Sequence, residues 1–372
     1  MRIAVIHHIS ATDNDYGFYV SDLLSEFGAW LGYDVQQLED FIFYTNKTKS
    51  LPENAVIGIH VKAKNMVTTR WWYGAKLPSI LAQVKAHVVV NLNGVYAKAT
   101  KIPQVLALPD VSFLQEDAKI KSVWKKLVAK NLAAYTGAAT ATFTYSQHAA
   151  ELIGTKTGTK PAIISYCAGK DYRVWEWHEK VLTKSEFTEG KEYFVCVLDD
   201  EDEDLWLTVL KAFSKFKKWQ QSTMQLLLLP KHEIVPLEIV DKMTTYKYRD
   251  DVQMLDNLSE KEKASLFGCA YAIIHIPAND ADLLPVAEAL ACATPLVVVT
   301  RDTQSLTEYG QDTGIAVAEP GAELLGDAII SIFKNEEQKS KMADNAKQQA
   351  AEKNRDENAR LLWEMIEKAA GF

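Results

Sequence analysis

The sequence predicts an α/β protein with two doubly wound domains, and two observations lead to this prediction. Short apolar runs rich in Val, Ile and Leu alternate along the chain with amphipathic stretches of helical spacing. Strands that are apolar throughout and separated by such helices are typical of parallel sheets covered on both faces. The alternation is interrupted once, at about residues 171–190, and then resumes, so the whole pattern occurs twice.

The first half of the chain contains five expected strands and four expected helices. The strands are RIAVIHHI, AVIGIHV, HVVVNLNG, ATATFTYS and PAIISYCAG. The helices are YVSDLLSEFGAWLGY, RWWYGAKLPSILAQVKA, KIKSVWKKLVAKNLAAYTGA and QHAAELIGTKTG. Pro78 is expected to start or kink the second of these helices, because proline lacks the N–H that a helix interior uses. Ser146 is expected to cap the fourth.

The second half repeats the alternation with shorter strands. The expected strands are YFVCVL, QLLLLP, VQML, YAIIHIP, PLVVV and GIAVA. The expected helices are DLWLTVLKAFSKFKKW, VPLEIVDKMTTY, SEKEKASLFGCA, PVAEALACA and GAELLGDAIISIFKN, followed by a helical tail that begins at EQKSK. The segment between the halves is polar and aromatic, as expected of a linker with a short helix. The predicted boundaries are a first domain at 1–170, a linker at 171–190, a second domain at 191–350 and a C-terminal helix at 351–372.

Composition narrows the class of function. The 372 residues carry a formal net charge of −8, which disfavours non-specific binding to nucleic acid or to an anionic membrane but allows a local basic patch. No stretch reaches the roughly 18 apolar residues of a membrane-spanning helix. The four cysteines are expected to be buried thiols, which indicates a reducing, cytoplasmic compartment, with peripheral attachment to a membrane as an alternative. The eight histidines show no metal-binding spacing, so no metal site is expected.

The sharpest motif is DADLLPVAEALACATPLVVV, residues 280–299. An apolar strand precedes it, and Pro285 suits the first turn of a helix. The N-terminus of that helix offers free N–H groups to a phosphate or a sugar. Asp280 and Glu288 are separated by seven residues, and both could accept hydrogen bonds from sugar hydroxyls. An ordinary strand–loop–helix unit with a capping aspartate is the alternative reading of this motif.

This stretch resembles the signature of the group 1 (family 4) glycosyltransferases, in which two glutamates stand at the same spacing. The pattern SLTEYGQDTGIAVAEPGAELLGDAI and the N-terminal strand, loop and helix also resemble the family, so the likeness covers most of the chain. The resemblance implies the GT-B fold: two Rossmann-like domains face a central cleft, and a C-terminal helix returns to the first domain. It implies acceptor binding by the first domain and nucleotide-sugar binding by the second.

The resemblance also implies roles for particular residues. Asp280 and Glu288 would be the catalytic pair, with Asp280 on donor hydroxyls and Glu288 on the ribose. No metal and no cofactor are implied, because the nucleotide sugar is a co-substrate. The substrate-binding residues expected by resemblance are Gly17, Asn93, Lys231, Leu283, Leu284, Pro285 and Glu308.

The donor loop departs from the family pattern. The run LDDEDED places Leu198 at the family's glycine, Asp199 at its arginine and Asp204 at its lysine. Cations that would neutralise a diphosphate are thus replaced by anions, and Coulomb's law makes this costly for the binding of an anion. The acid run also has readings unrelated to a donor. These are a solvated helix start favoured by the helix dipole, a divalent cation site at Asp200 and Asp202, or an acidic surface for a basic partner.

Other departures concern loops and aromatic residues. The family's two loop glycines are absent around Asp280, and Asn93 stands where the family often has histidine. Histidines at the end of the first strand, His7 and His8, could face the cleft. Two aromatic clusters could stack on a sugar or an acceptor, although packing is the simpler explanation for each. They comprise Trp71, Trp72, Tyr73, Trp175 and Trp177, with Arg70 and Lys76 flanking the first.

Two functions therefore remain open at the level of sequence. The first is transfer of a sugar from a nucleotide-sugar donor to a glycan, lipid or protein acceptor. The second is a catalytically inactive GT-B relative that binds a partner protein or a glycan. The residues around Glu288 and Glu308 favour the first, and the acid run with the lost glycines favours the second.

Overall fold

The computed structural model describes residues 1–8, 15–38, 51–63, 65–115, 123–198, 203–230, 237–277, 279–299, 308 and 312–372. The chain divides into two compact units. The first unit comprises Met1–Tyr166 and Arg355–Phe372, and the second comprises Cys167–Asn354. Within the described ranges, no helix is both long enough and apolar enough to cross a membrane.

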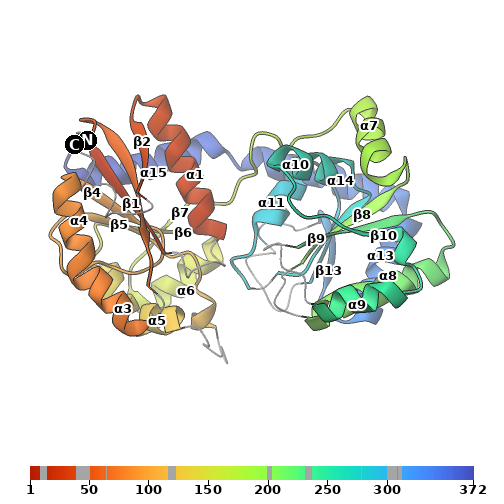
Figure 1. The fold of residues 1–372 in the computed structure, drawn as a ribbon. Helices are drawn as coiled ribbons and strands as arrows, with labels where there is room; N and C mark the ends of the chain where they lie inside the picture. The colour runs from red at the N-terminus through yellow and green to blue at the C-terminus, as the bar shows by residue number, and fades with distance from the viewer. Residues whose placement is uncertain are drawn as a thin grey trace. The chain divides into compact units, whose positions relative to one another are not determined.

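The first unit is built on a parallel sheet whose described strands run in the order β2-β3-β1-β4-β5-β6-β7 (Figure 1). The strands are β1 (Arg2–His8), β2 (Asp34–Leu38), β3 (Ala55–Val61), β4 (Val88–Asn91), β5 (Gln104–Ala107), β6 (Ala141–Thr144) and β7 (Ala162–Ile163). β4 and β5 are buried along their whole length. Burial on both faces explains why these strands are apolar throughout rather than alternating.

Helices cover both faces of this sheet. They are α1 (Asp15–Trp30), α3 (Met66–Trp71), α4 (Leu77–Val84), α5 (Val123–Ala138), α6 (Gln147–Thr157) and α15 (Arg355–Ala370), with a short 3₁₀ turn at Ser112–Leu114. α1 and α15 pack together, and α15 contacts β4 and β5. The right-handed crossovers place α3, α4, α5 and α6 on the opposite face, where α5 contacts α3 and α6 (Figure 1).

The helix around Pro78 is continuous but distorted, as the sequence predicts. A π-helical segment, Trp72–Lys76, joins α3 to α4, and the Leu77 N–H donates to the carbonyl of Trp72. Pro78 follows at the start of α4, where its missing N–H removes one helical hydrogen bond. Ser146 caps α6 as expected, since its side chain accepts from the Ala149 N–H.

The second unit contains a parallel sheet of described strands in the order β10-β9-β8-β11-β12-β13. They are β8 (Tyr193–Leu198), β9 (Gln225–Pro230), β10 (Val252–Met254), β11 (Ala272–His275), β12 (Leu296–Val299) and β13 (Gly314–Val317). The helices are α7 (Trp177–Thr188), α8 (Glu203–Trp219), α9 (Leu237–Thr245), α10 (Glu260–Cys269), α11 (Leu284–Ala291), α13 (Ala322–Lys334) and α14 (Glu336–Glu352), with a 3₁₀ turn at Arg249–Asp251. Trp206, Phe213 and Phe216 of α8 are fully buried in its core.

Three local expectations differ from the structure. The strands β2 and β5 have no counterpart among the expected strands, because DVQQL has only two apolar residues and QVLA only three, which give a weak signal. The expected strand PAIISYCAG is paired only at Ala162–Ile163. The tail forms two helices, α14 and α15, because the chain leaves the helical conformation at Lys353. α15 belongs to the first unit, which confirms that the C-terminal helix returns to it.

The predicted linker, 171–190, lies in the second unit. Its helix α7 contacts α10, and the preceding Trp175 packs directly on Gly268 of α10. The Arg173 guanidinium lies 4.6 Å from the centre of the Trp175 ring. A Cβ atom at position 268 would lie 2.1 Å from the indole, so only glycine admits this contact without a shift. Trp175 therefore anchors this segment by packing.

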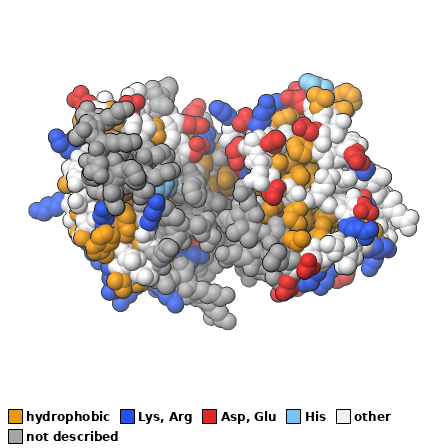
Figure 2. Space-filling model, viewed as in Figure 1, with side chains coloured by type: hydrophobic (Ala, Val, Ile, Leu, Met, Phe, Trp, Pro, Cys, Tyr) orange, Lys and Arg blue, Asp and Glu red, His pale blue; other side chains and the backbone are white. Residues whose placement is uncertain are grey.

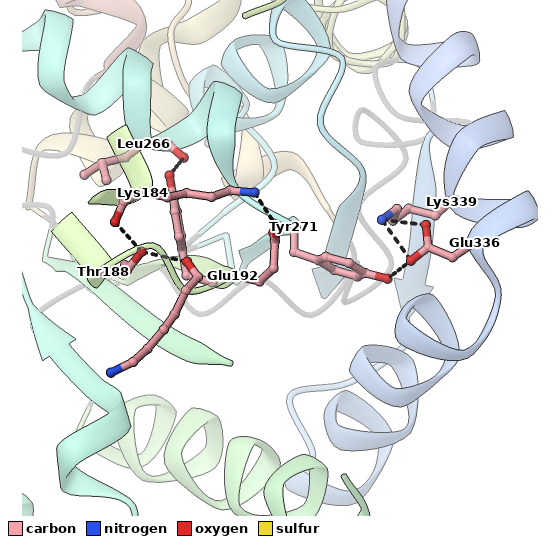
Figure 3. A network of polar contacts seen from close by, with 9 residues as sticks. Lys184, Thr188, Glu192, Leu266, Tyr271, Glu336 and Lys339 are labelled. Atoms are coloured by element: carbon pink, nitrogen blue, oxygen red, sulfur yellow. Dashed lines mark hydrogen bonds and ion pairs between the residues drawn. The ribbon is translucent and has the colours of Figure 1, made fainter. Parts of the chain in front are cut away.

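A polar network joins helices to the amino edge of the second sheet (Figure 3). Lys184 of α7 forms an ion pair with Glu192, 2.5 Å away, just before β8. The Tyr193 hydroxyl donates to the carbonyl of Leu266 in α10 at 3.0 Å. Tyr271, just before β11, donates to Glu336 of α14, and the Lys339 ammonium lies 3.7 Å from the centre of its ring. This network lies at the end of the sheet opposite the carboxyl ends of the strands.

Candidate functional site

The loop between β11 and α11 places two aspartates in a buried position. Asp280 and Asp282 are 2% and 4% exposed. The loop is held by its own polar groups, since the Ala281 N–H donates to the Asn279 side chain at 2.9 Å. His275, at the end of β11, contacts the Asp282 carbonyl through Nε2 at 2.9 Å. A carbonyl can only accept, so Nε2 carries the proton.

α11 begins immediately after this loop. Leu283 is its N-cap residue, and no side chain caps the helix. Pro285 occupies the first turn, as the sequence predicts, and Leu283 and Pro285 are buried whereas Leu284 is half-buried. A helix N-terminus without a side-chain cap leaves backbone N–H groups for an anion. The predicted residues Asp280, Leu283, Leu284, Pro285 and Glu288 therefore all belong to one loop–helix unit.

Glu288 is the buried acid of α11, with 2% of its surface exposed. Its Oε1 accepts a hydrogen bond from Lys263 Nζ of α10 at 3.1 Å. Its other oxygen, Oε2, has no hydrogen-bond partner among the described residues. A buried carboxylate oxygen without a donor is costly, so a ligand that supplied a hydroxyl there would bind favourably.

Aromatic residues surround the Glu288–Lys263 pair. The Lys263 ammonium lies 5.6 Å from the ring centre of Phe267 and 5.9 Å from that of Tyr172. The Tyr172 hydroxyl donates to Glu260 at 3.3 Å. Burial raises the pKa of the Tyr172 phenol, and the negative charges of Glu288 and Glu260 raise it further. Tyr172 is thus a neutral hydrogen-bond donor beside two carboxylates.

Burial also raises the pKa of the Glu288 carboxyl above its ordinary value. Lys263 opposes this effect through its charge and its hydrogen bond, and the neighbouring Tyr172 hydroxyl opposes it as well. The two influences differ in sign because desolvation disfavours the carboxylate whereas a neighbouring cation favours it. The ionisation of Glu288 therefore depends on Lys263 first and on Tyr172 second.

The acid run is only partly described. Leu198 is buried at the end of β8, Glu203 begins α8, and Asp204 is exposed in its first turn. Asp199–Asp202 and Lys231 lie outside the described residues. β8 pairs with β11, so the run leaves the strand next to the one that leads to Asp280. The divalent cation site considered at Asp200 and Asp202 lies outside the residues that the structure describes.

The remaining predicted residues have other neighbours. Glu308 is exposed, and its charge acts on Lys353, whose pKa is lowered mainly by burial. In the first unit, Gly17 is buried in the first turn of α1. Asn93 is buried after β4, where its Nδ2 donates to the Ile6 carbonyl at 3.0 Å. Asn93 therefore already has a structural role that ties β4 to β1.

Most of the histidine and aromatic candidates also lie among the described residues. His7 contacts Ser21 at 2.8 Å and stacks on His60, and burial together with His60 lowers its pKa to about 4. Tyr73 is buried, and burial raises the pKa of its phenol. Trp71 and Trp177 are exposed, as are Arg70 and, to a lesser degree, Lys76.

Two residues that sequence reasoning missed complete the surroundings of Glu288. Lys263 stands in the expected helix SEKEKASLFGCA directly before six buried residues. A lysine directly beside this apolar stretch was the available signal. Tyr172 gave no signal, because it lies in a segment with no regular pattern and reaches the site only through the packing of that segment on α10.

The match to a known protein family lies within the second unit. Residues 179–349 match the family described as glycosyl transferases group 1. A search of curated proteins gives no match. The solved structures to which the chain is similar over its whole length include HepE, WaaG and a sucrose-phosphate synthase.

HepE of Anabaena in complex with UDP and glucose gives a TM-score of 0.72 at 13% identity, with 99% of this chain and 100% of HepE covered. WaaG, a glycosyltransferase involved in lipopolysaccharide biosynthesis, gives 0.72 at 15% identity, with 98% and 99% covered. Sucrose-phosphate synthase of Thermosynechococcus elongatus gives 0.69 at 14% identity, with 99% and 98% covered. This likeness shows the fold, which is GT-B.

Proposed function

Residues 179–349 form a group 1 glycosyltransferase domain within a GT-B fold, and from this premise we propose that the protein transfers a sugar from a nucleotide-sugar donor. The observation that carries the proposal is the unpartnered, buried Oε2 of Glu288 on α11, a helix whose N-terminus has no side-chain cap. The transfer breaks the bond between the anomeric carbon and the diphosphate and forms one to an acceptor hydroxyl, whose proton is released.

Each part of the loop–helix unit has a task in this proposal. Glu288 Oε2 accepts a hydrogen bond from a ribose hydroxyl of the nucleotide. The first N–H groups of α11 bind the diphosphate, whose negative charge grows as the sugar leaves. Asp280 accepts hydrogen bonds from hydroxyls of the donor sugar. These interactions need no metal ion and no cofactor, as the sequence also predicts.

We propose a UDP-linked hexose as the donor, since the similar HepE was crystallised with UDP-glucose. The acceptor is proposed to be a glycan, a lipid or a protein, and the protein is proposed to act in the cytoplasm. The acids at Asp199 and Asp204 would weaken the binding of the diphosphate, because like charges near an anion repel it. We therefore expect the donor to bind less tightly than it would if arginine and lysine stood at positions 199 and 204.

Calorimetry with UDP-, GDP- and ADP-sugars tests this function. One UDP-hexose is expected to bind, and Glu288→Gln is expected to weaken it by about tenfold to a hundredfold, the value of a hydrogen bond to a charged group. Glu336→Gln is the matched control, because Glu336 lies in the network at the opposite edge of the sheet (Figure 3). Its donor affinity should equal that of the original protein.

Two results would count against the proposal. If the folded protein binds none of the donors, the inactive GT-B relative is the better description, with the fold kept for binding a partner protein or a glycan. If a donor binds but Glu288→Gln and Glu336→Gln are equally affected, the nucleotide does not depend on Glu288. In that case the donor site lies elsewhere.

A further inference from the structure

Helix α7 of the second unit presents its apolar side chains outward. Trp177 and Leu182 are 78% and 67% exposed, Val181 is 45% exposed, and Val174, just before the helix, is 44% exposed. A surface helix ordinarily turns its apolar stripe toward the core. In α7 the apolar side chains face solvent instead, and Figure 2 shows hydrophobic side chains gathered at the surface over this helix.

The face of α7 that packs inward is polar. Thr183 and Thr188 are buried. The Thr188 hydroxyl donates to the carbonyl of Lys184 at 3.0 Å, and the Lys184 ammonium pairs with Glu192 at 2.5 Å. Turning the helix over to bury its apolar side chains would break these contacts and leave buried polar groups without partners. The apolar face is therefore held outward.

A bidentate ion pair fixes the start of α7. The Arg173 guanidinium donates to both oxygens of Glu179, at 2.9 and 2.6 Å. The Glu176 N–H donates to the same carboxylate at 2.9 Å. The hydrogen bonds from Arg173 lower the pKa of the Glu179 carboxyl to about 2. The apolar face is thus ordered before anything binds to it, which reduces the entropic cost of binding.

The two ends of the exposed face differ in charge. The N-terminal end carries Arg173, His178 and the positive end of the helix dipole, with Glu176 as its exposed acid. The C-terminal end carries the exposed Glu186 and Glu189 together with the negative end of the dipole. Two copies of α7 placed antiparallel would bring ends of opposite sign together, whereas a parallel pair would bring like ends together.

Side-chain size also favours an antiparallel pair. Trp177 is the largest side chain of the exposed face, and Ser185, which is exposed two turns further along, is small. The two residues stand four positions on either side of Val181. A two-fold axis near Val181 would therefore set the indole of each copy against the serine of the other. Self-complementarity of this kind is what a two-fold symmetric interface requires.

The area of the face indicates how tightly two copies would bind. Its four apolar side chains together expose roughly 400–500 Å², because a large aromatic side chain alone has an area of about 200 Å². A pair would bury about 1,000 Å² in total, which is at the low end for specific interfaces. We therefore expect a dimer that dissociates at micromolar concentrations.

We propose that two copies of this protein dimerise through their α7 helices, packed antiparallel about Val181. The apolar centre of the interface consists of Val174, Trp177, Val181 and Leu182, and the charged ends of the helix form its rim. A second copy supplies both the small residue that Trp177 needs opposite it and the end charges of opposite sign. The proposal is independent of the glycosyl transfer proposed above, because none of these side chains belongs to the site around Glu288.

Sedimentation equilibrium of the whole protein tests the dimer. Between about 1 and 300 µM, the weight-average mass should rise from that of one chain toward that of two, with a Kd on the order of 10 µM. Val181→Glu should raise the Kd at least about thirtyfold, because two carboxylates would meet within an apolar contact.

Val240→Glu is the matched control. Val240 lies on α9 of the same unit and is 45% exposed, as Val181 is, so both variants place a glutamate at an equally exposed helix position. The control should keep its Kd within about twofold of the original, as a surface substitution outside the interface does. Circular dichroism and thermal unfolding would confirm that both variants are folded.

Cross-linking tests the position of the axis. All four cysteines of the chain are buried, so Val181→Cys adds an exposed thiol. A short bis-maleimide should join two copies of this variant at concentrations where the dimer is populated. Val240→Cys should stay uncross-linked under the same conditions.

Three results would overturn the proposal. They are a protein that sediments as one chain at every concentration, a dimer that Val181→Glu and Val240→Glu weaken equally, or equal cross-linking of the two cysteine variants. The first would mean that a molecule other than a second copy covers α7, and the others would place the interface elsewhere. None of these measurements uses a nucleotide sugar, so their failure would leave the proposed donor site unaffected.

Discussion

Glu288 and Lys263 form the residue pair on which the account of the site depends. Glu288 is buried and keeps one oxygen without a donor, while Lys263 is a quarter exposed and holds the other oxygen at 3.1 Å. Lys263 contacts the carboxylate rather than the proposed reacting atoms, so the role proposed for it is to position Glu288 and to favour its ionised form. In the proposed donor complex, an ionised Glu288 accepts a stronger hydrogen bond from a ribose hydroxyl than a protonated one would.

Replacing Lys263 by methionine is expected to make the protein sensitive to pH. Without its cation, the Glu288 carboxyl has a pKa raised further by burial, and a raised folded-state pKa costs stability as pH rises above the ordinary carboxyl value. The free energy of unfolding should be close to the original in acid and lower by about 1–2 kcal/mol near neutrality, because the partly exposed lysine is screened. Urea unfolding across a pH series measures this.

The same variant should bind the donor less tightly, and the pH at which donor affinity falls on acidification should move upward. Lys263→Arg should restore both properties in large part. A loss of stability that was the same at every pH would show that Lys263 acts only through packing on Phe267 and Tyr172, and would contradict the positioning role.

His7 gives a second pH dependence, located in the first unit. Its folded pKa is about 4, below the ordinary 6.5, so the neutral form is favoured by folding. Stability from this group is complete above the ordinary value and is lost as pH falls toward 4, by roughly 3 kcal/mol in total. His7→Gln should flatten that part of the stability curve relative to the original protein, as urea unfolding across the same pH series would measure. A curve unchanged by this substitution would contradict the assignment.

At the scale of elements, α10 is the helix that connects the site to its support. Lys263, which bonds to Glu288, lies on α10. Gly268 of the same helix packs against the indole of Trp175, and this contact anchors the segment that contains Tyr172. The tolerance for a side chain at position 268 is therefore small. A substitution there must displace either the indole or the helix that holds Lys263.

Gly268→Ala is expected to lower the free energy of unfolding by about 1–3 kcal/mol, the usual cost of overpacking. Gly137→Ala in α5 is the matched control, since a Cβ there meets nothing within 4 Å. It should stabilise the protein by up to about 1 kcal/mol, because alanine favours a helix more than glycine does. Denaturant titration of both variants measures the contrast. If Gly268→Ala left the free energy of unfolding unchanged, Trp175 would have to move aside without an energetic cost.

The sequence predicts elements well where a single local rule decides them. Pro285 and Ser146 marked helix starts, Pro78 marked a distortion, and continuous apolar runs marked the central strands. The sequence predicts strands and side-chain positions poorly where contacts between distant parts of the chain determine them. β5 is four residues long and is a strand because β4 and β6 lie beside it. Tyr172 reaches Glu288 only through the Trp175 anchor.

The same limit applies to roles of residues. Asn93 lies where the family resemblance expects a substrate contact, yet its amide is bonded to the Ile6 carbonyl. No sequence pattern reveals that partner, which is 87 residues away. Conversely, the spacing of Asp280 and Glu288 does identify a loop and a helix that the fold places together, because both lie within one strand–loop–helix unit.

At the scale of the whole molecule, the two units have distinct chemical characters. The second unit contains residues 179–349, which match the group 1 glycosyltransferases, with the buried Glu288 and an α11 whose N-terminus has no side-chain cap. The first unit carries a surplus of cations between Glu53 and Glu151 and the exposed Val67 and Trp71.

A crystal structure with UDP tests the central claim most directly. The account predicts a ribose hydroxyl within hydrogen-bond distance of Glu288 Oε2, the diphosphate at the N-terminus of α11, and the Lys263–Glu288 contact preserved. Nucleotide bound away from α11, or a Glu288 that faces only Lys263 while UDP is present elsewhere, would contradict it.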